Sequence, residues 1–214
     1  NISYDEESRA IRSNYPKGAN LIIASADADA RAVKQMGWYD IGYETLMDNP
    51  YYSFEKDVTG KASFDSVLLP TNNDPEATVK ATRINTGVDV TTATALKLES
   101  KIKGVEETGY YYLSREENPS QRSFGEFETD AKLFYIGYDK DSNVTNLVIR
   151  DGSYIKKNGE YIINIGEKAT VSAVVDGKTI RLDSFKKDTD AEKKDIESAE
   201  VLTSSKIIAS SSSS

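Results

Sequence analysis

Residues 124–183 read FGEFETDAKLFYIGYDKDSNVTNLVIRDGSYIKKNGEYIINIGEKATVSAVVDGKTIRLD, and they decide the fold class of this 214-residue chain. Three turn dipeptides, Asp151-Gly152, Asn158-Gly159 and Asp176-Gly177, separate short segments rich in Ile, Val, Tyr and Thr. Asn-Gly and Asp-Gly pairs accept the positive φ angles of tight hairpin turns, and β-branched and aromatic residues favour strands. The pattern therefore predicts consecutive antiparallel hairpins over this stretch.

Strand-like segments also precede this stretch. We expect strands at residues 19–25, 63–69, 76–84, 93–100, 109–113, 132–138, 144–150, 154–156, 161–165, 170–175 and 179–183. About ten or more strands at hairpin spacing predict an all-β chain that folds as one large antiparallel β-sandwich.

Three segments depart from the strand pattern. Residues 27–36 are interpreted as one or two helical turns closed by Gly37, and residues 37–52 as an irregular aromatic loop because of their Gly and Pro content. Residues 187–214 are charged and then Ser-rich, which is typical of a solvated linker or of the start of a following domain. We therefore expect a sandwich domain over residues 1–186, followed by a polar segment that adds little to its stability.

Composition excludes several kinds of chemistry. The chain has no His and no Cys, so it lacks the residues most used for proton transfer near pH 7, thiolate chemistry and zinc binding. Its 35 acidic and 27 basic residues give a net charge of -8, which disfavours nucleic acid as a partner. No segment approaches the roughly 18 apolar residues that span a bilayer. We predict no catalytic residue, metal, cofactor or membrane span.

One acidic segment partly matches a calcium-binding loop. Asp139, Asp141 and Asn143 have the spacing of its first three ligands. Val144 stands where that loop needs Gly, and Arg150 stands where it needs a bidentate Glu. The mismatch excludes a calcium helix–loop–helix; a polar turn is the prediction, and a looser oxygen-lined site is the alternative.

A second acidic pattern lies earlier in the chain. Glu126, Glu128 and Asp130 alternate, which places them on one face of a strand. They would form either a pair of carboxylates for acid–base chemistry or an ordinary solvated face. Because nothing in the pattern sets their separation or their partners, a solvated strand face is the prediction.

Aromatic residues are the remaining candidates for a binding surface. The chain has 13 Tyr and one Trp, and aromatic faces stack on sugar rings as well as filling sandwich cores. Core packing is the default role for the single Trp. If the aromatic segment faces a ligand instead, the carbohydrate-binding residues are Trp38, Tyr39, Tyr43 and Tyr52.

Three stretches also follow the order and spacing of a known family. Residues 37–43, GWYDIGY, resemble a Gly-Trp-x-Ser-x-x-Tyr-Gly loop, with Asp40 in place of Ser and Glu44 in place of the final Gly. Residues 64–70, FDSVLLP, resemble a Phe-x-Thr-x-Leu-x-Pro strand end. The third stretch comprises GEFETDA, LFY and DGSY, at residues 125–131, 133–135 and 151–154. Together they resemble the C-terminal β-sandwich of heparinase II/III-type polysaccharide lyases.

The resemblance implies a function as well as a fold. In such lyases an α/α toroid precedes a two-layered β-sandwich, and uronate-containing polysaccharides are cleaved by β-elimination. The family's catalytic Tyr, His and Asn have no match here, so the resemblance implies a later, non-catalytic portion that buttresses the cleft. It also implies a bacterial enzyme that is secreted or at the cell surface, with polysaccharide and the upstream toroid as partners. The alternative is a free-standing carbohydrate-binding or adhesive β-sandwich module.

Overall fold

The computed structural model describes residues 2–40, 42, 45–176, 179–185, 199–203 and 206–209. These residues form strands, turns and irregular segments, without a helix among them, and nearly all strand pairs are antiparallel. The predicted all-β, antiparallel fold is therefore confirmed. The chain divides into two compact units, which we call unit 1 (Asn1–Arg83 and Glu99–Val105) and unit 2 (Ile84–Leu98 and Glu106–Ser214).

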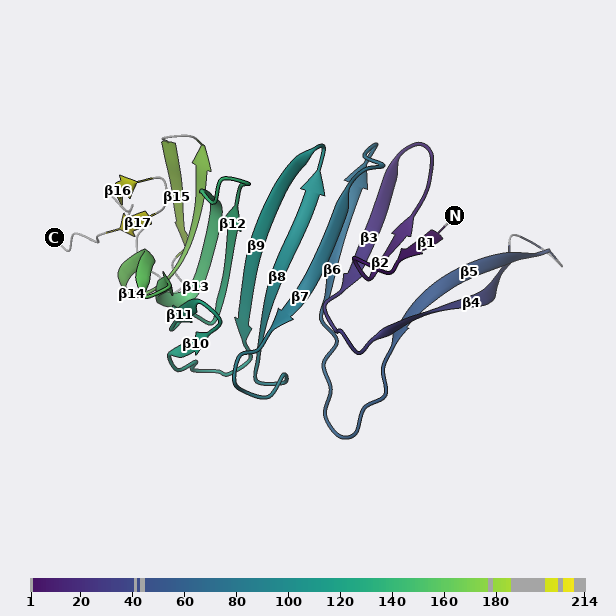
Figure 1. Ribbon diagram of the computed structural model, residues 1–214, viewed down its shortest axis with the longest axis horizontal. Helices are drawn as coiled ribbons and strands as arrows, with labels where there is room; N and C mark the ends of the chain where they lie inside the picture. Colours follow the sequence, from purple (N-terminus) through teal and green to yellow (C-terminus); the bar gives the residue numbers. More distant parts are fainter. Residues whose placement is uncertain are drawn as a thin grey trace. The chain divides into compact units, whose positions relative to one another are not determined.

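Unit 1 contains a four-stranded antiparallel sheet and a two-stranded ribbon (Figure 1). The sheet has the order β1 (Ile2–Asp5), β2 (Ala10–Ser13), β3 (Ala19–Ser25) and β6 (Ser66–Asn72). The ribbon pairs β4 (Arg31–Asp40) with β5 (Leu46–Glu55), and β7 (Thr78–Ile84) follows β6 in the chain. Ala24, Ala26 and Ala81 are among the most buried residues of this unit. Alanine side chains bury little apolar area each.

The ribbon corrects two predictions. The helical turns expected at residues 27–36 are not formed, and the described residues of the loop expected at 37–52 lie mostly in strands, because β4 and β5 pair along the whole of both strands. Gly37 fits in a strand because the ring of Tyr51 packs over the space that its missing side chain leaves. Pro50 fits because β5 is an edge strand, where an absent N–H on the unpaired side costs no ladder hydrogen bond.

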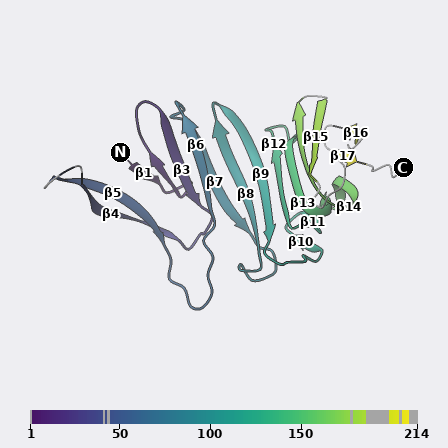
Figure 2. The same ribbon diagram turned by 180° about the vertical axis from the view of Figure 1, so that it is seen from behind.

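Unit 2 contains the two longest strands of the chain, β13 and β14, among the described residues. In chain order its strands are β8 (Ala93–Ile102), β9 (Val105–Ser114), β10 (Arg122–Phe124), β11 (Phe127–Thr129), β12 (Leu133–Tyr138), β13 (Val144–Lys157), β14 (Glu160–Asp176), β15 (Thr179–Phe185), β16 (Ala199–Thr203) and β17 (Lys206–Ala209). Within unit 2, the main path of the sheet has the order β16-β17-β14-β13-β12-β9-β8 (Figure 2). The strands β10 and β11 pair with each other, β11 also pairs with β13, and β15 pairs with β14. The division between the units runs through β8, whose last residues belong to unit 1.

Aromatic rings fill the core of unit 2. Tyr112, Phe124, Phe127 and Phe134 are all buried, and the ring centroids of their contacting pairs lie between 4.7 and 6.1 Å apart. Aromatic pairs at these distances each add about 0.5–1.5 kcal/mol beyond the burial of their area. The aromatic and β-branched residues that predict strands in this region therefore also supply its core.

The three turn dipeptides have different structures. Asn158-Gly159 forms the predicted hairpin turn between β13 and β14, with φ angles of 52° and 81°. Asp176 faces Thr179 across the ladder of β14 and β15, and Gly177 lies outside the described residues. Asp151-Gly152 is not a hairpin turn, because β13 continues through it as a bulge with register shifts on both sides of Gly152. A bulge accepts the same positive φ, here 48° at Asp151, without reversing the chain. The strands expected at residues 144–150 and 154–156 are consequently one strand.

Two strands lie inside the predicted C-terminal linker. β16 and β17 pair antiparallel, and β17 pairs parallel with β14, with Ile207 opposite Ile163. Parts of residues 187–214 therefore extend the sheet of unit 2. The domain boundary near residue 187 stays a prediction.

Candidate functional site: the β4–β5 hairpin

The β4–β5 hairpin presents two different faces. Side chains alternate along a strand, so neighbouring residues point to opposite sides. One face, which we call the Trp38 face, combines Ala32, Lys34, Met36, Trp38 and Asp40 with their partners Phe54, Tyr52, Pro50, Asp48 and Leu46. The other, the Tyr39 face, combines Arg31, Val33, Gln35, Gly37 and Tyr39 with Glu55, Ser53, Tyr51, Asn49 and Met47.

The Trp38 face is apolar toward the end of the hairpin and exposed there. The side chain of Trp38 is 72% exposed, and Met36 and Leu46 on the same face are also exposed. Tyr52 is half-buried, and its ring centroid lies 6.1 Å from that of Tyr4 in β1. The default expectation that the single Trp packs in the core is therefore wrong. Trp38 lies on the exposed part of this hairpin.

The Tyr39 face joins exposed aromatic rings to a short chain of hydrogen bonds. Tyr39 and Tyr51 are 59% and 45% exposed. A side-chain carbon added at Gly37 would lie 3.4 Å from the ring of Tyr51, so this ring lies against the glycine. The Tyr51 hydroxyl donates to Oε1 of Gln35 at 2.5 Å, and Nε2 of Gln35 donates to Glu55 at 3.1 Å. These bonds orient the Tyr51 ring while one side of it stays open to solvent.

The four predicted carbohydrate-binding residues do not form one patch. Trp38 and Tyr52 lie on the Trp38 face, whereas Tyr39 lies on the opposite face. Tyr43 lies outside the described residues. Four further exposed large hydrophobic side chains of the hairpin were not among the predicted site residues, namely Met36, Leu46, Met47 and Tyr51. The alternation of side chains between the two faces of each strand would have identified them, but only after the segment had been assigned as a hairpin.

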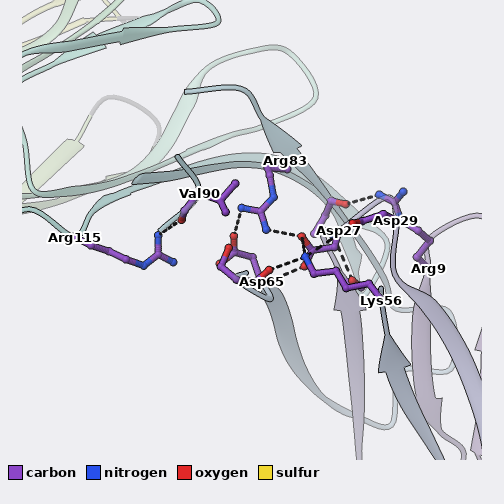
Figure 3. A network of polar contacts seen from close by, with 11 residues as sticks. Arg9, Asp27, Asp29, Lys56, Asp65, Arg83, Val90 and Arg115 are labelled. Carbon is purple, nitrogen blue, oxygen red and sulfur yellow. Dashed lines mark hydrogen bonds and ion pairs between the residues drawn. The ribbon is translucent and has the colours of Figure 1, made fainter. Parts of the chain in front are cut away.

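A buried network of charges anchors the base of the hairpin. Asp27 precedes β4 and Lys56 follows β5, and Nζ of Lys56 lies 3.1 Å from Oδ1 of Asp27. Arg83 of β7 forms ion pairs with both Asp27 and Asp65, the latter just before β6 (Figure 3). The side chains of Asp27 and Lys56 are only 3% and 8% exposed. Both ends of the hairpin are thus tied to the strands of unit 1 that follow it.

The charged groups of this network also have hydrogen-bond partners. The backbone N–H of Asp65 donates to Oδ2 of Asp27 at 3.0 Å, and Lys56 also donates to the carbonyl of Ser63 at 2.7 Å. Burial by itself raises the pKa of Asp27, but the hydrogen bonds from Asp65, Arg83 and Lys56 outweigh it and hold the pKa below its ordinary value of 3.8. Two carboxylates face two cations, so this group of four carries no net charge. Its arrangement suits anchoring and not proton transfer.

Glu126, Glu128 and Asp130 do not form a pair of acid–base carboxylates. Lys156 lies 2.8 Å from Glu128, and Lys157 lies 3.5 Å from Glu126. Asp130 accepts hydrogen bonds from the backbone N–H and the hydroxyl of Ser153, at 2.7 and 2.8 Å. Each carboxylate therefore has a structural partner of its own.

The segment that resembles a calcium loop is a closed polar turn. The carboxylate of Asp139 accepts hydrogen bonds from the backbone N–H groups of Asp141 and Asn143, at 2.9 and 2.8 Å, and from the side chain of Asn143. The hydrogen bonds from Asn143, first of all from its side chain, lower the pKa of Asp139. No group of acidic residues within the described part of the chain has the arrangement of a metal site.

Comparison of the chain with protein-family models and with curated proteins gives no match. Within the described ranges there is no helix long and apolar enough to cross a membrane. The exposed aromatic faces of the hairpin, held by the buried charges at its base, are consequently the candidate site. Such a surface can stack on apolar faces and hydrogen-bond to hydroxyl groups.

Proposed function

We propose that this chain is the non-catalytic β-sandwich portion of a heparinase II/III-type polysaccharide lyase, and that its β4–β5 hairpin contacts the polysaccharide. The family resemblance of residues 37–43, 64–70 and 125–154 supports the lyase part of the proposal. The high exposure of Trp38 on an anchored hairpin supports the contact with sugar. This exposure is the observation that carries the proposal, because clustered exposed apolar side chains mark interaction surfaces.

The chemistry around Trp38 suits a sugar ring. An indole ring offers a flat apolar face to the C–H groups of a pyranose, and carboxylates accept hydrogen bonds from sugar hydroxyls. Asp48 lies directly opposite Trp38 on the neighbouring strand, and Asp40 and Lys34 share the same face. Lys34 is the group that would pair with a uronate carboxylate. We infer that the face binds a segment rich in hydroxyl groups with few negative charges.

A first experiment concerns catalysis. We expect the purified chain to have no eliminase activity, because a general base contributes typically 10²–10⁴-fold to a rate and the chain has no His. The measurement is the absorbance of the unsaturated uronate product with heparan sulfate, hyaluronan and alginate. Turnover by the chain that a single substitution within it abolishes would contradict the proposal.

A second experiment concerns binding. Trp38 is the only Trp, so selectively excited tryptophan fluorescence reports on this face. We expect an oligosaccharide to shift that fluorescence, and Trp38→Ala to weaken binding by about 1–3 kcal/mol, by analogy with base stacking on aromatic rings. Because the side chain is 72% exposed, the same change should leave the thermal midpoint nearly unchanged.

Tyr39→Ala is the matched control for this experiment, since Tyr39 is an exposed aromatic residue on the opposite face of the same strand. Loss of affinity with Trp38→Ala alone locates the sugar on the Trp38 face. Equal affinity of both variants and the unmodified chain would refute a role of the hairpin in sugar binding.

A free-standing carbohydrate-binding module is the second candidate, and the exposed hairpin favours it equally. The two candidates differ in the binding expected of the isolated chain, because a free-standing module binds sugar without any other domain. Binding by the isolated chain at micromolar concentration would favour the module. Binding that requires an upstream helical toroid, together with a His- and Asn-bearing strand in the parent sequence, would favour the lyase.

A further inference from the structure

The outer edge of β4 is a long row of backbone groups that no described strand pairs with. The ribbon has the order β4-β5, and each strand is ten residues long. Native proteins usually cover or interrupt such an edge, because its free N–H and C=O groups are a template for another strand. Met36, Trp38 and Tyr39 are exposed along β4. Its exposed charged side chains, Arg31, Lys34 and Asp40, include both signs, so a suitable partner strand can pair them.

The two edges of the ribbon differ in one residue. Pro50 lies in the middle of β5, and a proline in a strand has no N–H and directs its nitrogen toward the unpaired side. The outer edge of β5 is therefore interrupted. β4 contains no proline, so β4 is the edge that can accept a complete strand.

We propose that the β4 edge pairs with β4 of a second copy of this chain. The two strands run antiparallel about a twofold axis at Gly37, perpendicular to the ribbon. A closed twofold arrangement uses the same surface of both copies. This axis also places the Trp38 faces of both copies on the same side of the combined sheet. Residues that lie directly opposite each other across the two β4 strands therefore belong to the same face.

The side chains of β4 select this register. With Gly37 opposite its own copy, Lys34 faces Asp40, Gln35 faces Tyr39 and Met36 faces Trp38 of the second copy. Asp40 is the only acidic residue of β4, and Lys34 and Arg31 are its only cations. Lys34 shares a face with Asp40, whereas Arg31 lies on the other face. Among symmetric registers, only the one centred on Gly37 therefore places a cation opposite the acid.

The facing pairs are favourable in themselves. Opposite charges directly across two strands attract each other, and a thioether next to an indole ring is a favourable contact. Twofold symmetry makes each of these pairs occur twice. The product is a four-stranded sheet with the order β5-β4-β4-β5, in which both aromatic faces double in width. Pairing involves the edge and not the faces, so this proposal does not depend on sugar binding.

Disulfide trapping tests the register directly, because the chain contains no Cys. We expect a mixture of the Lys34→Cys and Asp40→Cys chains to form a covalent dimer under mild oxidation. Neither variant alone should do so, because six residues along a strand separate the two copies of each position by about 20 Å, far beyond the reach of a disulfide. Lys34→Cys mixed with Asp48→Cys, a residue of β5 on the same face, is the matched control.

Association of the unmodified chain tests the proposal independently. Sedimentation over a concentration series should show a dimer that Lys34→Glu weakens by about tenfold, because two opposite-charge pairs become like-charge pairs. The double variant Lys34→Glu/Asp40→Lys restores opposite charges and should restore the dimer. Far-UV circular dichroism checks that each variant is folded. A monomer at all concentrations up to about 1 mM, or trapping through Asp48→Cys as efficient as through Asp40→Cys, would overturn the proposal.

Discussion

Replacing Asp27 with Asn should destabilise unit 1 by about 3 kcal/mol, which is the lower end of the range for removing one partner from a buried ion pair. The side chain of Asp27 is only 3% exposed and accepts hydrogen bonds from Lys56, Arg83 and the N–H of Asp65. Asn has the same shape but no charge. The substitution therefore leaves the buried Lys56 and the partly buried Arg83 with only one carboxylate among the four side chains.

The remaining contacts explain why the cost is not larger. Arg83 keeps its ion pair with Asp65, and Lys56 keeps the carbonyl of Ser63. Replacing Lys56 with Met as well removes the surplus charge, so the double variant Asp27→Asn/Lys56→Met should be more stable than Asp27→Asn alone. Such a gain is the sign of direct coupling between the two positions.

Urea unfolding and amide hydrogen exchange provide the assay. Exchange of the β3 and β6 amides reports on unit 1, since these strands pair from Ala19↔Asn72 to Ser25↔Ser66. Asp57→Asn is the matched control, because Asp57 forms an ion pair with Arg31 at 3.1 Å but is 93% exposed. Exposed ion pairs contribute little to stability. A loss with Asp27→Asn no larger than that with Asp57→Asn would refute the role assigned to the buried network.

Acid should weaken unit 1 through the same carboxylate. The folded-state pKa of Asp27 is lowered, so its contribution is complete above its ordinary pKa of 3.8 and is lost as the pH falls through the lower folded-state value. Asp27→Asn should therefore flatten the dependence of stability on pH below about 4. An unchanged acid dependence in the variant would show that other carboxylates control it.

The remaining predictions concern unit 2, with Gly37 of unit 1 as a comparison. Gly152→Ala should destabilise the chain by about 1–3 kcal/mol in thermal unfolding, because the new carbon would lie 2.5 Å from Cβ of Ala131. Gly37→Ala, with its nearest contacts at 3.4 Å, should cost clearly less, and equal losses would contradict this account of the bulge. Tyr138→Phe should be neutral or stabilising because the buried hydroxyl of Tyr138 has no hydrogen-bond partner among the described residues. Tyr112→Phe should cost about 0.5–1.5 kcal/mol, since it removes the bond from Nε of Arg122 at 3.1 Å, and the reverse order of these two stabilities would refute the comparison.

Local sequence signals determined the fold class and several of its details. Strands need β-branched and aromatic residues and period-two patterns, which act within a few residues of one another, so β7, β8 and β12 are visible in the sequence. The Asn158-Gly159 hairpin is visible for the same reason. The absence of His and Cys is likewise a property of composition alone. It removes common catalytic chemistry whatever the fold.

Tertiary structure decided what local signals leave ambiguous. The same kind of dipeptide makes a turn at Asn158-Gly159 and a bulge at Asp151-Gly152, because the outcome depends on whether neighbouring strands continue to pair. Similarly, residues 31–40 are a strand because β5 pairs with them, although their own sequence also suits a helical turn.

For the candidate site, too, the sequence identifies some features and only the tertiary structure shows the others. The sequence identifies Trp38 and Tyr39 as an aromatic pair, but only the hairpin register shows that they lie on opposite faces and are exposed. Nothing in the sequence connects Asp27, Lys56, Asp65 and Arg83, which come together from widely separated positions (Figure 3). Burial and charge pairing of this kind depend on contacts distant in the chain. Local propensity determined the strands, and the long-range contacts of unit 1 determined how the hairpin is anchored and which of its side chains reach solvent.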